Sequence, residues 1–531
     1  MTRDLLGRLE QWKGRFGPPE TGGLERLLAA AARHRFRNAE DLIRLHETAL
    51  FLRAYPRTPE VARLADAILF SFAERTAVLA DLDAFEAPEI SGIAGTSLSA
   101  VFSYEIARFL AARYPRRVEI AWDRYDGIDR MGPVLSRLLP LLDEDWAVEA
   151  HVPFREWISA ARGSGSGLAW LLQRLERIPG PRERAAAYAA LELPLTWRIG
   201  NVRASRSRLR LPVKKLYCHG EPLLRRSGLS LQQELEAPPL PVTRLPQPQA
   251  RKMLDLVLDT SAMRYRELYG FSHPEEDRVF RADAGRGVEI FYFGAPPAWR
   301  LPLRAYHAGM FFKNGVPAGY VELLSLFERA EVGFNLYYTF REGESAWIYA
   351  RLLRLFRQVL GVNTFSVDPY QIGLENPEAI DSGAFWFYRK LGFRPVDPQI
   401  AKLVEREERR MRQTPGYRSS RTTLEKLAAG YILFEGPSAE AGAWDRFRIR
   451  NLALAATRAP GVESSGGLAL ALGLIPDLEH WTAKEKRAAE KILRAKEAGE
   501  EAQYLRLMQR HPRMRAAFLK LGSVTPSLAA P

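Results

Sequence analysis

The sequence contains only one cysteine, Cys218, so no disulfide can form within the chain. This scarcity of cysteine favours a reducing compartment. Long hydrophobic runs are missing as well: the longest, residues 467–475, ends before Pro476 and is much shorter than the roughly 20 apolar residues of a membrane-spanning helix. Residues 1–15 carry charges throughout, unlike a secretory signal. We therefore expect a cytoplasmic protein without a membrane span.

Clusters of histidine, cysteine and acidic residues at metal-ligand spacing are also missing from the sequence, so we expect no metal. Acidic residues are in the minority: 77 lysines and arginines stand against 63 aspartates and glutamates, which gives a net charge of +14. Such a charge permits attraction to nucleic acid, to an acidic membrane surface or to an anionic cofactor. Solvated helix faces rich in arginine explain it more simply.

The most basic segment, residues 198–226, has nine positive residues and one acid, Glu221. Arg206, Arg208 and Arg210 alternate, so on a strand they would share one face. That face either meets phosphates or is the solvated side of a sheet. Because no aromatic residues alternate with the arginines to stack on bases, we favour the solvated side.

Apolar spacing and proline content divide the chain into four parts. Residues 1–236 are expected to be mainly helical, including a helix over 99–114, with a basic, strand-rich end. Residues 237–248 hold five prolines and are expected to form a semi-rigid linker. Residues 249–436 alternate between strand and helix patterns. Residues 437–531 are expected to form a helical, basic tail.

The segment from Ala330 to Pro395 carries the clearest pattern in the chain. Aromatic and branched residues over 331–340 predict a strand, a glycine-containing turn follows, and apolar periodicity predicts a helix over 347–360 that Gly361 ends. A turn that opens into a helix presents unpaired N–H groups and the positive end of the helix dipole. This arrangement suits a phosphate or pyrophosphate.

Further elements flank that turn and helix. A second strand is expected over 362–367, and a short helix that begins near Ser382 is closed by Gly392. Upstream, Asn314-Gly315 predicts a tight hairpin between two strands. The chain therefore predicts several antiparallel strands before the turn, and a helix, a strand, a second helix and a further strand after it.

Together these features resemble the GNAT acetyltransferase superfamily, whose members bind acetyl-CoA. In that family a loop with small residues holds the pyrophosphate before the central helix, and Gly343 and Ser345 take its two small positions here. A later helix has the pattern Asn-x-x-Ala-x-x-x-Tyr-x-Lys-x-Gly-Phe, matched by Asp381 (in place of Asn), Ala384, Tyr388, Lys390, Gly392 and Phe393. The resemblance covers about residues 250–435 and implies an α/β (α+β) fold with a GNAT-like mixed sheet and flanking helices.

The resemblance also implies an activity: an acyl-CoA-dependent N-acyltransferase that transfers an acetyl group to an amine by direct attack. Tyr388 matches the family's general acid, and Glu331 resembles the position of a general base in some members; Glu322 and His307 are further candidates for the base. The contacts to acetyl-CoA are implied for Phe334, Leu336, Tyr338, Arg341, Gly343, Glu344, Ser345, Ala346, Asp381 and Ala384. The acceptor amine, small molecule or protein, stays open.

Two other interpretations of the same residues stay open. A catalytically inactive GNAT-like domain that serves as a binding module would fit Asp381 and the loop, where Glu342 and Glu344 bring negative charge to the pyrophosphate position. A transferase that takes its acyl group from aminoacyl-tRNA, as some relatives of the fold do, would suit the basic charge. We favour the acyl-CoA-dependent enzyme because Tyr388 and the Gly-Phe pair are intact.

Overall fold

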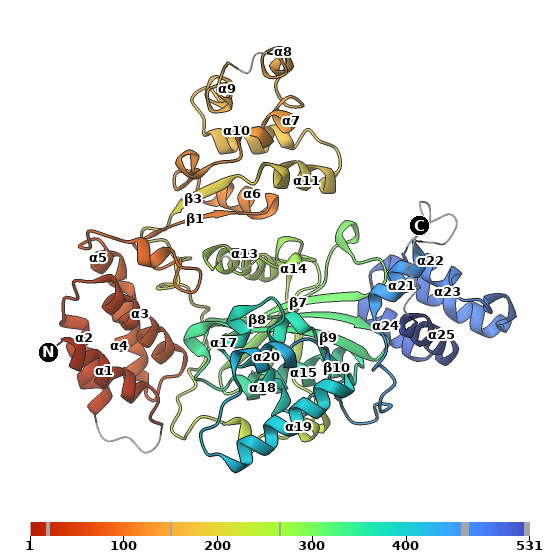
Figure 1. Cartoon of the computed structure of the whole chain (residues 1–531). Helices are drawn as coiled ribbons and strands as arrows, with labels where there is room; N and C mark the ends of the chain where they lie inside the picture. The colour runs from red at the N-terminus through yellow and green to blue at the C-terminus, as the bar shows by residue number, and fades with distance from the viewer. Residues whose placement is uncertain (1, 17–21, 149–150, 265–266, 458–466, 525–531) are drawn as a thin grey trace.

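The computed structural model describes residues 2–16, 22–148, 151–264, 267–457 and 467–524. Figure 1 shows four parts: a group of N-terminal helices, a lobe that rises above the centre, a central sheet with its helices, and a group of C-terminal helices at the opposite side. The protein is mixed α/β, with one large mixed sheet and many helices. Within the described ranges, every helix is too short or too polar to cross a bilayer.

The central sheet has nine strands in the described residues, in the order β11-β12-β10-β9-β8-β7-β6-β5-β4. All neighbours are antiparallel except β9 and β10, which run parallel. The strands are β4 (Val242–Arg244), β5 (Phe280–Gly285), β6 (Val288–Phe293), β7 (Ala305–Lys313), β8 (Val316–Leu326), β9 (Arg329–Leu336), β10 (Thr364–Val367), β11 (Arg394–Pro395) and β12 (Ile432–Glu435).

The predicted hairpin is confirmed and joins β7 to β8. Asn314 and Gly315 both take positive φ, 47° and 78°, as a two-residue turn that matches the twist of the strands requires. The amide of Asn314 also donates to the carbonyl oxygens of Ala54 (2.8 Å) and Tyr217 (3.0 Å). The turn is therefore tied to the N-terminal helices as well as to its own strands.

Helices cover both faces of the sheet, as alternation along β6 shows: Ile290 and Tyr292 enter the large core, and Phe291 and Phe293 enter a smaller core on the other face. The helices on the second face are α13 (Gln247–Met263) and α14 (Tyr269–Ser272). The helices of the large core include α15 (Ser345–Leu360), α16 (Pro369–Ile372), α17 (Pro377–Asp381), α18 (Ala384–Arg389), α19 (Pro398–Gln413) and α20 (Arg421–Leu427).

The N-terminal helices pack into the same large core as the sheet. Two of their starts follow from the sequence: the Asn38 side chain accepts from the Asp41 N–H at 2.8 Å, and Thr58 caps the helix that Pro59 begins. The helices are α1 (Thr2–Lys13), α2 (Gly23–Arg33), α3 (Ala39–Ala54), α4 (Pro59–Phe70) and α5 (Phe72–Thr76).

The upper lobe has a core of its own and corrects one prediction. The helix expected over 99–114 is instead β1 followed by α6, because Ser97–Val101 pairs antiparallel with β3. Pairing with a distant strand here overrides the local apolar spacing. The lobe contains β1 (Ser97–Val101), α6 (Tyr104–Arg113), β2 (Val118–Ile120), α7 (Gly132–Leu135), α8 (Leu142–Trp146), α9 (Phe154–Ala161), α10 (Gly167–Leu175), α11 (Pro181–Leu191) and β3 (Pro194–Arg198).

The basic segment differs from the predicted strand. Residues 201–210 form turns, and Arg206 is buried, with both carboxylate oxygens of Glu47 2.9 Å from its guanidinium. Arg210 pairs with Asp66 at 2.7 Å. Arg206 therefore does not share a face with Arg208 and Arg210, because Glu47 of α3 holds it inside, whereas Arg208 and Arg210 line one surface hollow.

The proline-rich segment 237–248 is more than a linker. After α12 (Leu231–Glu236), β4 pairs with β5 at the edge of the sheet, and α13 begins at Gln247. At the other end of the chain, the helices α21 (Ile449–Ala456), α22 (Gly467–Gly473), α23 (Ala483–Ala498), α24 (Glu501–Gln509) and α25 (Pro512–Ser523) add to the large core. Both terminal regions thus complete the packing of the sheet.

A buried ion cluster joins the sheet to the start of α15. Glu344 and Lys313 are fully buried, and their charged atoms lie 3.2 Å apart. The guanidinium of Arg286, in the turn between β5 and β6, approaches the same carboxylate at 2.5 Å, and the Leu224 N–H donates to it at 3.1 Å. Burial lowers the pKa of Lys313 to about 8. Burial alone would raise the pKa of Glu344, but the hydrogen bonds from Arg286 and the charge of Lys313 lower it overall.

We expect Lys313→Met to lower the free energy of unfolding by about 3 kcal/mol, because it leaves the buried Glu344 carboxylate with one cation instead of two. Adding Glu344→Gln to that variant should recover part of the loss. Equilibrium urea denaturation of the single and double variants measures this coupling. As a control, Arg63→Met removes one member of the exposed pair Arg63–Glu60 and should leave stability unchanged. Additive effects of the two core changes would contradict the prediction.

Candidate functional site

A cavity of about 220 Å³ opens where β9 and β10 separate. The two strands pair only from Arg329 to Glu331, opposite Thr364 to Ser366. Beyond that point β9 stays paired with β8 as far as Leu336, but no described strand pairs with its other edge. The backbone groups of this edge are therefore available to an extended ligand, which can bind as an added strand does.

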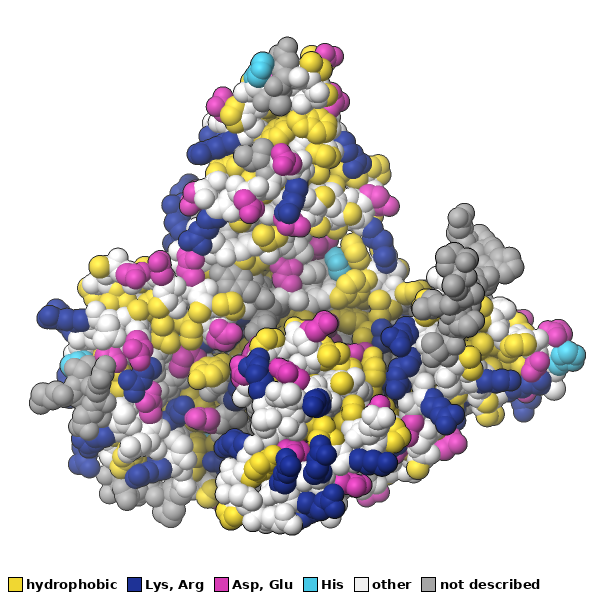
Figure 2. Space-filling view, in the orientation of Figure 1, with side chains coloured by type: hydrophobic (Ala, Val, Ile, Leu, Met, Phe, Trp, Pro, Cys, Tyr) yellow, Lys and Arg dark blue, Asp and Glu magenta, His cyan; other side chains and the backbone are white. Residues whose placement is uncertain are grey.

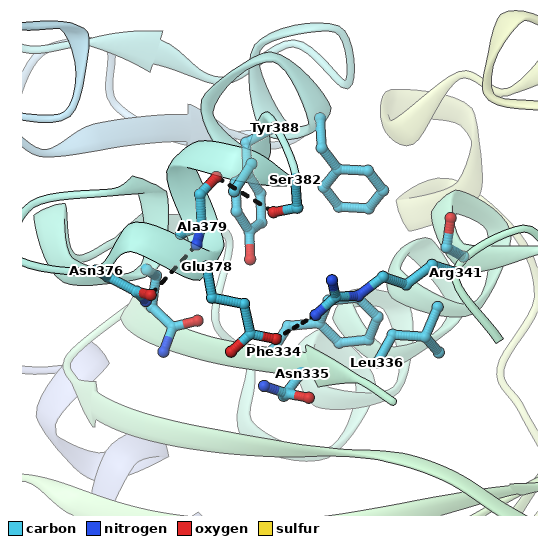
Figure 3. Close-up of a pocket in the computed structure, with 13 residues that line it drawn as sticks. Phe334, Asn335, Leu336, Arg341, Asn376, Glu378, Ala379, Ser382 and Tyr388 are labelled. Atoms are coloured by element: carbon cyan, nitrogen blue, oxygen red, sulfur yellow. Dashed lines mark hydrogen bonds and ion pairs between the residues drawn. The ribbon is translucent and has the colours of Figure 1, made fainter. Parts of the chain in front are cut away.

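Three segments that are separate in the sequence meet around this cavity (Figure 3). The end of β9 supplies one wall, the loop and first turn of α15 a second, and the run from α16 through α17 to α18 the third. The residues predicted from the sequence that line it are Phe334, Leu336, Arg341, Ser345, Ala384 and Tyr388. Three aromatic rings in these walls pack against one another. Phe334 stacks on Phe387, with ring centres 6.3 Å apart, and Tyr388 meets Phe387 edge-on, with ring centres 5.2 Å apart.

Tyr388 directs its hydroxyl into the cavity (Figure 3). Its ring is held edge-to-face by Tyr349 and Phe393, with ring centres 5.5 and 5.6 Å away. Burial raises the pKa of Tyr388 well above its ordinary value, so the phenol is protonated at neutral pH. No protein partner for this hydroxyl is found among the described residues. It is therefore placed to donate its proton or a hydrogen bond to a bound molecule.

The start of α15 gives the cavity a positive side. Glu344 stands at the N-cap position but turns its side chain into the buried ion cluster, so it does not cap the helix. The first N–H groups, among them those of Ser345 and Ala346, have no acceptor within the helix. Arg341 lies at the rim, where its charge is balanced by an ion pair with Glu378 (Figure 3). An anionic group bound at this place would interact with the helix dipole, the free N–H groups and the guanidinium of Arg341.

Other residues predicted from the sequence lie outside the cavity. Glu331 forms ion pairs with Arg304 (3.4 Å) and Arg329 (3.7 Å) and lines a separate, much smaller hollow. Tyr338 is 59% exposed and follows the end of β9. Asp381, in α17, is paired with an arginine of α20 at 3.0 Å. These three side chains do not meet Tyr388 around the cavity.

Gly343 and Ala346 contribute through packing. A Cβ atom on Gly343 would lie 2.5 Å from the hydroxyl oxygen of Tyr55, at the end of α3, so only glycine allows this approach. Ala346 is buried in the large core. The Glu344 carboxylate, expected from the sequence to lie near a bound pyrophosphate, is instead neutralised inside the protein. The loop thus carries less negative charge than its sequence indicates.

Besides Asn335 of β9, whose neighbours Phe334 and Leu336 were predicted, the sequence analysis missed four polar residues of the cavity: Gln371, Asn376, Glu378 and Ser382. For Asn376, the sequence does contain a signal, that of a helix N-cap. This residue precedes Pro377 and caps α17, its side chain accepting from the Ala379 N–H at 3.2 Å. For the other three, only the folded arrangement of α16 and α17 beside β9 brings them to the cavity.

Glu322 is one of the further candidates for a base. It belongs to β8, where it pairs with Gly333 of the neighbouring strand β9. A Cβ atom on Gly333 would lie 3.8 Å from Cβ of Glu322 and 3.7 Å from the amide nitrogen of Gln371, which lines the cavity. The absent side chain thus leaves space between the two. Burial raises the pKa of Glu322, although Tyr306 donates a hydrogen bond to its carboxylate. His307 precedes Ala308, the residue of β7 that pairs with Glu322; it is buried, and burial lowers its pKa to about 4.

Comparisons with models of protein families, with curated proteins and with solved structures gave no significant match for this chain. Within the described residues, no group of three or more histidines, cysteines or acids is arranged to hold a metal ion.

Proposed function

We propose that the chain transfers an acyl group, most simply acetyl, from acyl-CoA to an amine. The observation that carries this proposal is the convergence of the free edge of β9, the uncapped start of α15 and the Tyr388 hydroxyl on one cavity. The three features supply the three requirements of the reaction at one place: a strand-like partner for a pantetheine arm, an anion site for the pyrophosphate and a proton donor for the leaving sulfur. The resemblance found in the sequence points to these same three features, although Asp381, Glu331 and Tyr338 lie outside the cavity.

The chemistry follows from these positions. The amine nitrogen attacks the thioester carbonyl carbon, the C–N bond forms, and the C–S bond breaks. N–H groups on the edge of β9 polarise the carbonyl oxygen as its negative charge develops. Tyr388 donates a proton to the departing thiolate, which leaves as free CoA. The proton that the amine loses must pass to a base.

We assign that base to Glu322 in preference to Glu331. The carboxylate of Glu331 forms ion pairs with Arg304 and Arg329 and lines a separate hollow away from Tyr388. Glu322 has a raised pKa and lies across Gly333 from the cavity. A carboxylate with a raised pKa is a stronger base once it is ionised.

Ser345→Asp tests the pyrophosphate site. The new carboxylate lies at the start of α15, where it should stabilise the helix by about 0.5 kcal/mol through the helix dipole while repelling a pyrophosphate. We expect calorimetry at physiological salt to show acetyl-CoA binding weakened by at least about tenfold, with no loss in melting temperature. Ser345→Ala is the matched control and should keep most of the affinity. Binding that the aspartate does not change would place acetyl-CoA elsewhere or nowhere.

Tyr388→Phe tests the proton donor. The variant should bind acetyl-CoA as the wild type does and lose about 100-fold in the rate of transfer to an amine, because only the proton donation is removed. Tyr349→Phe is the control: its hydroxyl is buried beside Tyr388 but does not line the cavity. Release of free thiol from acetyl-CoA in a screen of amines reports the rate. If the wild type binds acetyl-CoA and no amine is acylated, the domain is a binding module.

Glu322→Gln tests the base through the pH dependence. In the wild type kcat/KM should rise with pH through the pKa of Glu322, which lies above its ordinary value, and then level off as the carboxylate becomes fully ionised. The glutamine variant should lose this rise and about 100-fold in rate at neutral pH. An unchanged profile in Glu322→Gln, with the rise lost instead in Glu331→Gln, would return the role to Glu331.

A further inference from the structure

The upper lobe contains a second cavity, of about 340 Å³, near α7, α8 and α9 at the end of the lobe farthest from the central sheet (Figure 1). Four aromatic side chains line it: Trp122, Tyr125, Trp146 and Phe154. They come from a short 3-10 turn after β2, from α8 and from the start of α9. Such a concentration of rings around a hollow is unusual for a lobe whose core is mainly leucine and other aliphatic residues.

Packing fixes these rings in place. Trp122 and Tyr125 meet edge-to-face with ring centres 6.2 Å apart. The Tyr125 hydroxyl lies within hydrogen-bond distance of the carbonyl oxygens of Gly127 (2.6 Å) and Leu191 (3.0 Å). Trp146 rests on Gly132, where a Cβ atom would lie 2.1 Å from its indole ring, so glycine is needed for this contact. The cavity is therefore preformed, which lowers the entropy cost of binding.

The charge of the cavity is negative. Asp129 and Asp145 line it together with one arginine, Arg155, which is exposed and also borders a neighbouring groove. Arginine and lysine side chains lie over many aromatic rings elsewhere in the protein, for example Arg174 over Trp170. In the described part of the chain, none lies over the four rings of this cavity. Their electron-rich faces are thus not occupied by the protein's own cations.

We propose that this cavity binds a methylated ammonium group, such as a quaternary ammonium ion. The faces of the aromatic rings attract a cation, and the two carboxylates add to this attraction. A quaternary ammonium carries no N–H that needs an acceptor, so it enters an aromatic cavity at a lower cost than a primary ammonium does. The proposal is independent of acyl transfer, since the cavity belongs to the separate core of the upper lobe.

The test is a titration of the full-length protein, by calorimetry, with choline and with its uncharged carbon isostere 3,3-dimethylbutan-1-ol. The two molecules have the same shape, so a difference in affinity reports the charge alone. We expect choline to bind about tenfold more tightly than the isostere and more tightly than ethanolamine, which lacks the methyl groups. A peptide with trimethyllysine, compared with its unmodified form, distinguishes a protein side chain from a free small molecule as the natural source.

Phe154→Leu removes one ring and Asp129→Asn one negative charge, and each should weaken choline binding several-fold. Asp123→Asn is the matched control, because Asp123 is exposed on the same 3-10 turn as Trp122 but does not line the cavity. Three outcomes would each overturn the proposal. Choline and its isostere could bind equally well, neither choline nor the trimethyllysine peptide could bind, or neither cavity variant could change the affinity for choline. The comparison of choline with its isostere needs no variant, so it decides even if a variant does not fold.

Discussion

The candidate site depends on one buried interaction, the ion cluster of Glu344 with Lys313 and Arg286. A glutamate at the N-cap position of α15 would normally place its negative charge against the helix start, where it would compete with an anionic ligand. Here two cations hold it on the other side of the backbone, and the helix start remains open toward the cavity. Lys313 belongs to β7 and Arg286 to the turn before β6, so the same interaction fixes α15 to the sheet.

The N-terminal helices also contact the loop before α15, because Tyr55 packs against Gly343. Through Tyr55, at the end of α3, these helices therefore support the loop.

Local signals made much of the central part predictable. The Asn314-Gly315 pair required positive φ at both positions, and α15 has a continuous apolar stripe ended by Gly361, which takes φ 73°. The spacing from Ala384 to Tyr388 places both on one face of α18, and that face lines the cavity. Glu344 could not be read in the same way. In the sequence it is a charge in a loop, and only contacts with residues 31 and 58 positions away reveal that its charge is neutralised.

Distant partners also explain where the sequence analysis was wrong. Residues 99–101 belong to the stretch 99–114 that was predicted to be helical, yet they form the end of β1 because β3, almost a hundred residues later, offers a row of backbone partners. Arg206 alternates with its neighbours in a strand-like way, yet Glu47 holds it inside the protein. Burial would raise the pKa of Glu47, but Arg206 brings it to about 2, so the pair stays charged. An unpaired charge at this depth would cost far more free energy than a strand would gain.

These internal pairs change what the net charge of +14 means. A chain with this excess invites comparison with nucleic-acid-binding proteins, but such binding requires cations gathered on one face. Figure 2 shows lysines and arginines spread over several parts of the visible surface, with acidic side chains between them. In the most basic segment, Arg206 and Arg210 are committed to Glu47 and Asp66. The candidate sites differ in their charged groups: the cavity beside α15 has the uncapped helix start and the Arg341–Glu378 pair, whereas the aromatic cavity of the upper lobe has two aspartates and one arginine. Local arrangement, and not the total, therefore decides which ligand each surface attracts.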